Sequence, residues 1–470
     1  MNGLHRVEAR KSRKIARTVT ICALALAVVP IVAQQAPPPT EPQQPGAGAQ
    51  VHTGTSIGLD ADVRLRNLLA DHQFNLLESQ LDGLPPAQAQ FYRGILANRD
   101  NDAKGSIQLL EPLVEQVAAS GDKSQEKILR KALAEDYLRL GDWKKAAQAY
   151  QTLSSRVDAQ LSADERDEIE MQLKLLPLAA GNPSMTAEPC DPFMLQVSRN
   201  PLGLTDIPVF VDARPHTWML DPTAPFNLIS RSQAKEVGLK VSEQAATIHT
   251  LTGRTIQVHV AVVPRFTIGG RLTLRNMTAF VFEDADYAFP VSRYQVQGVL
   301  GYPALAALGS LTITADATIQ VRPAAQVSKS GPDDRLISGA RFFVDGDQLI
   351  VALGEEGRER MFGIDAAGQQ TYLTSRYFDE HASDFNNQKM ELFSVPGSQT
   401  LPPQAAYVLE TLPLTIGENT VNVHYVQVLA QPVGSAALDD LYGMLGIDAL
   451  SQLRAYTFDY RTMRFSVRPE

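Results

Sequence analysis

The feature that most restricts the fold of this 470-residue chain is a set of motifs that occurs twice, in the same order, in its second half. Asp221 and Asp365 each follow a short apolar stretch. Eight and nine residues after each aspartate come an aliphatic and a hydroxyl residue, Ile229-Ser230 in the first copy and Leu373-Thr374 in the second. Equal spacing at separate places in one chain is typical of an internal repeat.

The later motifs keep this spacing. Gly253 and Gly397 each stand 32 residues after their aspartate, in turn-like surroundings. Gly-Val-Leu-Gly at 298–301 begins 77 residues after the first aspartate, and Gly-Met-Leu-Gly at 443–446 begins 78 residues after the second. Both copies end on Val-Arg-Pro. The register drifts by only a few residues, so we expect two domains with a common plan.

The pattern of apolar residues predicts that this half is mostly β. Short alternating runs such as residues 256–262 and 311–314 are typical of half-buried strands. Helical stretches are confined to the neighbourhoods of 231–237, 303–308 and 447–453.

These motifs resemble those of the retropepsin-like aspartic peptidase superfamily. Residues 220–230, with the short helical stretch that follows, are similar to the family's Asp-Thr-Gly-Ala loop and its helix. The two Gly-x-Leu-Gly segments are similar to its second motif. The resemblance implies two tandem retropepsin-like β-barrel lobes, residues 195–325 and 338–470, which supply both halves of one site that binds a peptide or protein substrate.

The resemblance also assigns roles to residues. It implies a catalytic pair made of Asp221 and Asp365, with neither metal nor cofactor. Residues expected to support the active-site loops are Thr223, Ser230, Thr374, Gly301 and Gly446, and the expected flap residues are Gly253 and Gly397.

The chemistry of such a pair follows from its charges. Two carboxylates about 3 Å apart cannot both ionise, so they share one proton. The charged member activates a water molecule, and the protonated member polarises the scissile carbonyl.

Both copies depart from the family motif. Pro222-Thr223 and Ala366-Ala367 stand where the family has Thr-Gly, and Pro222 removes a backbone N–H beside the carboxylate. Two hypotheses therefore remain open: an active aspartic endopeptidase, or a catalytically impaired relative that binds extended peptides by pairing with strand edges.

Residues 59–180 differ in composition and predict a helical domain. Residues 132–150 resemble a tetratricopeptide hairpin, with small residues at Ala134 and Ala147 and a break at Gly141-Asp142, and residues 92–110 are a weaker copy. A plain helical bundle is the alternative. Stacked repeats of this kind favour a docking or spacer role, so a protein partner could bind there.

The N-terminus predicts export. Residues 1–33 combine a basic start, an apolar stretch and a small-residue exit, which is typical of a signal peptide or an uncleaved anchor. Residues 34–58 are a Pro- and Gln-rich linker. We expect a periplasmic or secreted protein that meets a membrane only through this first segment.

Charge and motifs exclude other functions. The net charge is −9, and it is −14 without residues 1–33, because six basic residues against one acidic residue there contribute +5. An acidic chain repels phosphate backbones, so nucleic acid is an unfavourable partner. The sequence has no His-Glu-x-x-His motif and no phosphate-binding Gly-x-x-x-x-Gly-Lys motif.

Overall fold

The computed structural model describes residues 56–222, 224–249, 255–290, 292–326, 339–346, 348–365, 370–394, 403–433 and 436–468. The segment 1–33 and most of the linker 34–58 lie outside these residues. So do Thr223 and the two expected flap residues, Gly253 and Gly397.

Residues 56–179, called here the helical region, contain eight α-helices among the described residues: α1 Ser56–Ala70, α2 Phe74–Ser79, α3 Pro86–Arg99, α4 Ala103–Leu110, α5 Val114–Ser120, α6 Lys123–Arg139, α7 Trp143–Val157 and α8 Ala163–Ala179. Side-chain caps set several of their starts. Asp122, Asp142 and Ser162 accept hydrogen bonds from the first turns of α6, α7 and α8. Gly141, which has a φ of 68°, lies in the turn that separates α6 from α7.

The rest of the chain is rich in sheet. Residues 186–326, the first lobe, contain β1 Thr186–Ala187, β3 Ser198–Arg199, β4 Thr205–Val211, β5 Arg214–Leu220, β6 Leu228–Ser230, β7 Ala246–His249, β8 Thr255–Ile268, β9 Leu272–Phe282, β10 Ala288–Phe289, β11 Tyr294–Gln295 and β12 Gly298–Leu300, with helices α9 Arg231–Glu236 and α10 Tyr302–Leu308. Residues 339–468, the second lobe, contain β16 Gln348–Glu355, β17 Arg358–Ile364, β18 Tyr372–Leu373, β19 Glu391–Phe393, β20 Gln404–Ile416, β21 Asn419–Leu429 and β22 Gly443–Leu445, with helices α11 Ser375–His381, α12 Ala436–Asp439 and α13 Ile447–Gln452. The predicted order, a helical region before a sheet-rich region, is confirmed.

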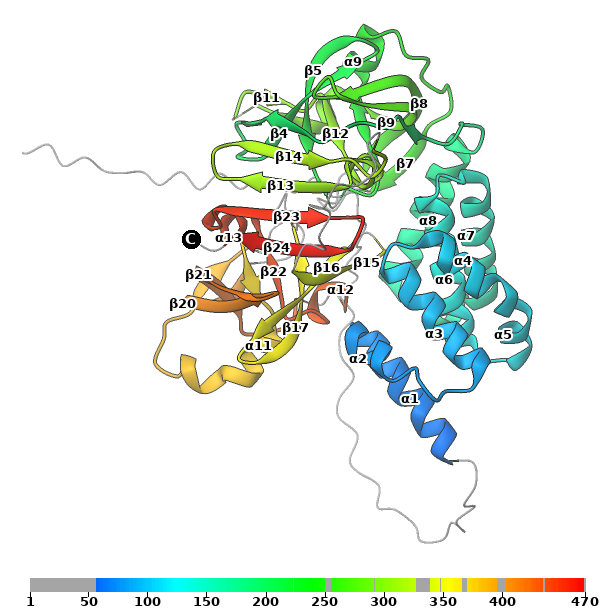
Figure 1. The fold of residues 1–470 in the computed structure, drawn as a ribbon, viewed down its shortest axis with the longest axis vertical. Helices are drawn as coiled ribbons and strands as arrows, with labels where there is room; N and C mark the ends of the chain where they lie inside the picture. The colour runs from blue at the N-terminus through cyan, green and yellow to red at the C-terminus, as the bar shows by residue number, and fades with distance from the viewer. Residues whose placement is uncertain are drawn as a thin grey trace, which may run out of the picture.

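Six strands from both lobes form a continuous layer between them, in the order β2-β14-β13-β23-β24-β15. Their bounds are β2 Phe193–Gln196, β13 Ser310–Thr314, β14 Thr318–Arg322, β15 Ala340–Asp345, β23 Ala455–Asp459 and β24 Arg464–Arg468. The lobes join where β13 pairs with β23, and there the Thr312 and Thr457 hydroxyls lie 2.8 Å apart. Figure 1 shows this layer between the two lobes.

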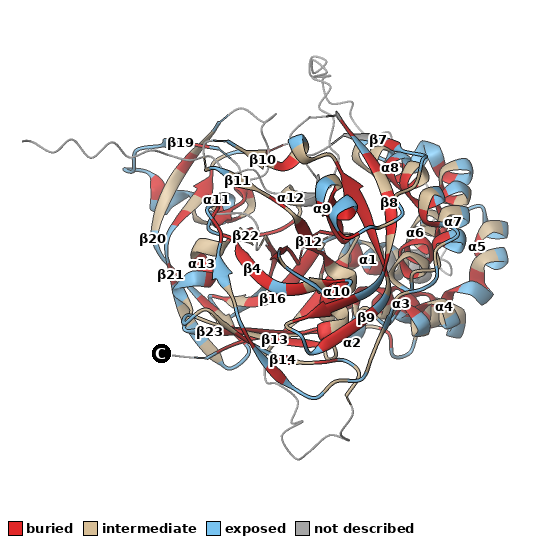
Figure 2. Ribbon diagram, turned by 90° about the horizontal axis from the view of Figure 1, so that it is seen from above, coloured by how far each residue is buried: buried red, intermediate tan, exposed pale blue. Residues whose placement is uncertain are grey.

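The helical region packs against both lobes (Figure 1). Its earlier helices share a core with the second lobe, where the ring of Phe74 lies 4.7 Å from that of Phe343. Its later helices share another core with the first lobe, where Leu175 and Leu176 join Met219. Figure 2 shows buried residues concentrated on the strands at the centre and on the inner faces of the helices. One part of the helical surface is therefore already occupied by the lobes.

No helix among the described residues is both long enough and apolar enough to cross a membrane.

Candidate active site

The first expected catalytic residue, Asp221, lies directly after β5, and a parallel neighbour holds its backbone. Strand β12 pairs with β5 so that Leu300 lies opposite Leu220. The backbone N–H of Asp221 donates to the carbonyl of Leu300 at 3.1 Å. The next residue, Gly301, donates its N–H to Oδ1 of buried Asn227 at 3.1 Å.

Asp365 occupies the same position in the second lobe. It follows β17, and β22 pairs with β17 in parallel, with Leu445 opposite Ile364. The backbone N–H of Asp365 donates to the carbonyl of Leu445 at 2.9 Å. Gly446 donates its N–H to Oγ1 of buried Thr371 at 2.9 Å. Both aspartates are thus held by the same two hydrogen bonds, one from the aspartate and one from the glycine.

Asn227 and Thr371, which accept these bonds from the glycines, were not among the residues expected from the sequence. Each stands six residues after its aspartate, so the repeat spacing could have found them. Because one side chain is an amide and the other a hydroxyl, the sequence alone does not show that the two positions are equivalent.

Gly301 and Gly446, two of the expected loop-support residues, each donate a hydrogen bond described above, and close backbone approach explains why both are glycine. A Cβ on Gly301 would lie 2.2 Å from the carbonyl oxygen of Phe226, and one on Gly446 would lie 2.7 Å from the carbonyl carbon of Gln370. Neither backbone neighbour can move aside as a flexible side chain can.

Ser230 and Thr374 brace the chain just before the Gly-x-Leu-Gly segments. The backbone N–H of Ser230 donates to the carbonyl of Gln297 at 2.8 Å, and that of Thr374 to the carbonyl of Tyr442 at 3.1 Å. The side chains of Ser230 and Thr374 make different hydrogen bonds. Ser230 Oγ accepts from the N–H of Gln233 and caps α9, whereas Thr374 Oγ1 donates to the carbonyl of Leu441. They contact the strands that support the aspartates.

The two aspartates differ in burial. Asp221 is 0% exposed, whereas Asp365 is partly exposed. Burial, and then the nearby Tyr302 and the charge of Asp221, raise the pKa of Tyr460. Burial and the charge of Asp365 likewise raise the pKa of Tyr372. Each carboxylate therefore lies near a buried tyrosine, one at the end of β23 and the other on β18.

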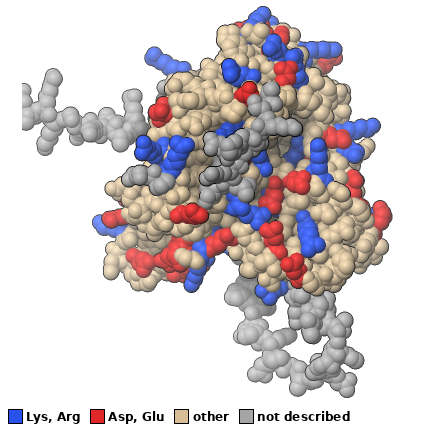
Figure 3. Space-filling model, viewed as in Figure 1, with Lys and Arg blue, Asp and Glu red and all other residues tan. Residues whose placement is uncertain are grey.

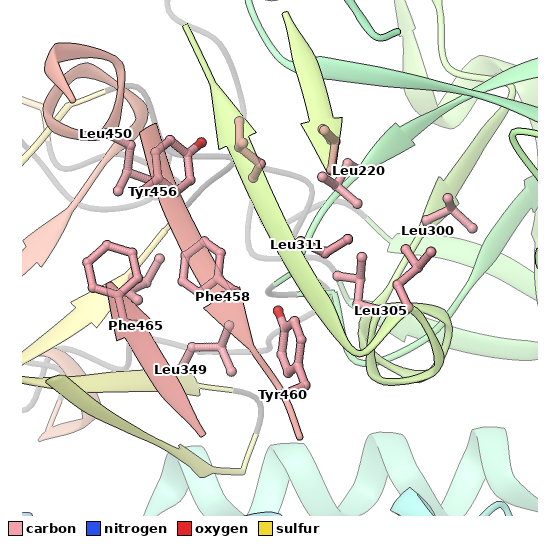
Figure 4. Close-up of a cluster of buried hydrophobic side chains, with 14 of the residues drawn as sticks. Leu220, Leu300, Leu305, Leu311, Leu349, Leu450, Tyr456, Phe458, Tyr460 and Phe465 are labelled. Carbon is pink, nitrogen blue, oxygen red and sulfur yellow. The ribbon is translucent and has the colours of Figure 1, made fainter. Parts of the chain in front are cut away.

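A small apolar pocket lies beside the first loop, between the six-stranded layer and the lobes. Its volume is about 20 Å³, enough for one water molecule and too small for a peptide side chain. Figure 4 shows three of the lining residues, Leu220, Leu311 and Tyr460, within a cluster of buried hydrophobic side chains. The pocket is lined by Thr205, Leu220, Pro222, Leu305, Leu311, Ile313, Ile447, Tyr456, Phe458 and Tyr460. Pro222 follows Asp221 and Ile447 follows Gly446, so the pocket touches both loop systems, but neither Asp221 nor Asp365 is among its lining residues.

No metal-binding group lies at this pocket among the described residues; the one His/Glu group that they contain is Glu355, Glu356 and His381, elsewhere in the second lobe.

Part of the first lobe is similar to a known protein family. Residues 207–304, about a fifth of the chain, match the family described as aspartyl protease. The matched segment contains Asp221, Ser230 and Gly301, which form the loop system of the first lobe. The first lobe is thus similar to an aspartyl protease over the residues that hold its aspartate. No curated protein sequence matches the chain significantly.

Solved structures with a partial likeness include three proteins. Basic 7S globulin from soybean is 11% identical, with a TM-score of 0.34, and the match covers 59% of this chain and 94% of the globulin. The protein titled edgp is 9% identical, with a TM-score of 0.35 and coverage of 59% and 94%. A retropepsin-like aspartic protease from Rickettsia conorii is 20% identical, with a TM-score of 0.21 and coverage of 28% and 97%.

Proposed function

We propose that this chain is an exported, retropepsin-like aspartic peptidase in which Asp221 and Asp365, one from each of two tandem lobes, form a single catalytic pair. The observation that carries this proposal is the matched pair of hydrogen bonds from Asp221 to Leu300 and from Asp365 to Leu445. Strand pairing supports tandem copies, because β12 relates to β5 and β6 as β22 relates to β17 and β18.

The proposed reaction is hydrolysis of a peptide bond. The ionised member of the pair takes a proton from water, whose oxygen attacks the scissile carbonyl. The protonated member donates a hydrogen bond to the carbonyl oxygen, and the C–N bond breaks as the amine leaves with a proton. The substrate is an extended segment of peptide or unfolded protein.

A second candidate function is peptide binding without cleavage, and the first loop favours it. Asp221 is fully buried, and Pro222 provides no backbone N–H beside the carboxylate. Catalysis tolerates displacements of about 0.5 Å in its groups, so a loop built on Pro222 could hold a peptide without cutting it.

For the helical region we propose a tetratricopeptide-like stack that fixes the two lobes relative to each other. Its separate cores with the two lobes support this role. A protein partner of the kind expected from the sequence would bind the helical faces turned away from the lobes. Export to the periplasm or medium rests on residues 1–33 alone.

The decisive experiment is digestion of denatured casein by the full chain between pH 3 and pH 7. The peptidase proposal expects cleavage that is strongest at acid pH and is abolished by Asp221→Asn and by Asp365→Asn separately. Asp212→Asn is the matched control. Asp212 also follows an apolar strand, but it lies in a turn with a φ of 46°, a conformation that asparagine tolerates.

Loss of cleavage in only one active-site variant would contradict a shared pair. If the wild type cuts nothing yet binds extended peptides, and both variants bind equally well, the binding function replaces the peptidase. A chain that neither cuts nor binds peptides would refute both functions.

A further inference from the structure

We infer that Glu355, Glu356 and His381 form a binding site for a divalent transition-metal ion in the second lobe, apart from the proposed catalytic pair. The Nε2 atom of His381 lies 3.7 Å from Oε1 of Glu355 and 3.6 Å from Oε2 of Glu356. One ligand atom from each residue lies within 4.8 Å of the other two. An imidazole nitrogen with two carboxylate oxygens is a donor set that Zn²⁺ uses in sites with an open fourth position.

The orientation of His381 is fixed from outside the cluster. His381 ends α11, and its Nδ1 lies 2.9 Å from the carbonyl oxygen of Tyr377. A carbonyl can only accept, so Nδ1 carries the proton and donates it. In the neutral ring the lone pair is then on Nε2, which faces the two glutamates. Metal-binding histidines are commonly oriented by this kind of bond from the second ring nitrogen. The ring also stacks on Tyr377, with centroids 4.1 Å apart.

The distances from Nε2 of His381 to the two carboxylate oxygens fit atoms that bind one shared ion better than they fit direct hydrogen bonds. Charge-assisted N–H···O bonds are about 2.7–2.9 Å long, well below the 3.6 and 3.7 Å found here. Two atoms that each lie about 2.1 Å from a tetrahedral ion are separated by roughly 3.4 Å. The gap between Nε2 and the carboxylates therefore matches ligands that share one ion.

The hairpin between β16 and β17 presents the two glutamates from a tight turn. Glu355 ends β16 and pairs with Arg358, and the turn residues Glu356 and Gly357 have φ values of 48° and 76°. The side chain of Glu355 is 2% exposed and that of Glu356 is 67% exposed. One ligand is thus rigid and buried, and the other leaves a path by which an ion can enter.

Neighbouring charges leave the ligand oxygen of Glu355 available. The Nε atom of Arg360 lies 3.5 Å from Oε2, the other carboxylate oxygen of Glu355. The hydroxyl of Tyr442 also donates to this oxygen, at 3.4 Å. The Arg360 guanidinium is held on that side, 4.3 Å above the Tyr442 ring. Figure 3 shows acidic side chains, with basic ones beside them, over the part of the second lobe where α11 lies in Figure 1. Two of the basic residues of this region, Arg358 and Arg360, pair with Glu380.

The ion would join the β16–β17 turn to the end of α11 and so stabilise the second lobe. Strand β17 runs from Arg358 to Ile364, so the site lies about 20 Å along the strand from Asp365. The proposed ion therefore takes no part in peptide hydrolysis, and loss of either proposal leaves the other intact.

The test is titration of the EDTA-treated full chain with ZnCl₂ by calorimetry at pH 7.5, with MgCl₂ as the hard-cation comparison. We expect one saturable zinc site per chain and weaker or no binding of magnesium. His381→Gln and Glu356→Gln should each weaken zinc binding by at least about tenfold. Glu355→Gln is avoided because it would also remove one of the two carboxylates that pair with Arg360, the other being Glu380.

Two matched controls should bind zinc as the wild type does. In His259→Gln the lost histidine also has Nδ1 near a carbonyl, that of Ser242 at 2.8 Å. In Glu418→Gln the lost glutamate also lies in a hairpin turn, between β20 and β21.

The competing explanation is a protonated His381 that pairs with both glutamates and needs no ion. It predicts a charged imidazole at pH 7.5, which the nitrogen shifts of His381 in the NMR spectrum would reveal. That result, an absence of saturable zinc binding, or unchanged affinity in His381→Gln and Glu356→Gln would each overturn the inference.

Discussion

Arg341 in β15 donates from Nη2 to both carboxylate oxygens of Asp100, at 2.9 and 2.7 Å, and so ties the second lobe to the end of α3. Its Nη1 donates to Oδ1 of Asn75 at 2.8 Å and also contacts Glu78, and both of these residues lie within α2. The side chain of Arg341 is only 18% exposed. One guanidinium therefore joins two helices to a strand of the six-stranded layer.

Removing this guanidinium should loosen the helical region. Arg341→Gln leaves the carboxylates of Asp100 and Glu78 without their cation at a partly buried interface, so we expect a loss of about 1–3 kcal/mol in the free energy of unfolding. Arg93→Gln is the control, because the ion pair of Arg93 with Asp82 is exposed and long at 3.7 Å. It should change stability by less than about 0.5 kcal/mol. Urea unfolding measures both, and equal effects would contradict a structural role for Arg341.

Glycine at 301 should be indispensable for the first loop. Gly301→Ala places a methyl group 2.2 Å from the carbonyl oxygen of Phe226, so the loop that holds Asp221 must shift. We expect a loss of at least about 2 kcal/mol in the free energy of unfolding.

Gly181→Ala serves as the control for this variant, because a Cβ there meets nothing within 4 Å and needs no positive φ. Thermal unfolding of the two variants compares them directly. If Gly301→Ala melts at the wild-type temperature, the close backbone approach is not a constraint on the loop.

The sequence predicts most of this loop system, because segments at equal spacing in the two copies become paired strands in the same arrangement. The Gly-x-Leu-Gly segments stand 77 and 78 residues after the aspartates, and each becomes the parallel neighbour of its aspartate's strand. The short helix α11 was not predicted, since its seven residues, Ser375–His381, lack a clear apolar period. Its counterpart α9 was predicted at nearly the same place in the first lobe.

Contacts between distant segments lie beyond such reasoning. Arg341 and Asp100 are 241 residues apart, and no periodicity relates a strand of the second lobe to the end of a helix. His381 likewise acquires Glu355 and Glu356 only when α11 packs beside the β16–β17 turn. The sequence predicts which elements form, whereas side-chain complementarity decides which surfaces meet.

The hydrogen bond from Gly301 to Asn227 should be replaceable by the one that the second lobe uses. Asn227→Ala removes the buried acceptor of the Gly301 N–H and should cost about 1–3 kcal/mol. Asn227→Thr places at this position the residue type of Thr371, whose hydroxyl accepts from Gly446, and should recover part of the loss. Denaturant unfolding of the three proteins tests this. A threonine variant no better than the alanine variant would show that the two positions are not equivalent.

Glu126 in α6 should make the helical region sensitive to acid. Burial by itself raises its pKa, but hydrogen bonds from Arg156, Lys123 and Arg130 outweigh this effect and lower the pKa to about 2. In the unfolded chain the same carboxyl has a pKa near its ordinary value of 4.5. The unfolded state therefore binds the proton first as the pH falls, and the contribution of Glu126 is complete above about pH 4.5 and is lost toward pH 2.

Glu126→Gln removes this titration, because the amide carries no charge at any pH. We expect the variant to be less stable than the wild type at pH 7, by about 1–3 kcal/mol, since three basic side chains lose their shared carboxylate. The difference should shrink steadily as the pH is lowered from 5 to 3. The free energy of unfolding, measured in urea at intervals across this range, checks the convergence. A difference that stays constant with pH would mean that Glu126 contributes by packing alone, and one that grows toward acid would reverse the sign of the argument.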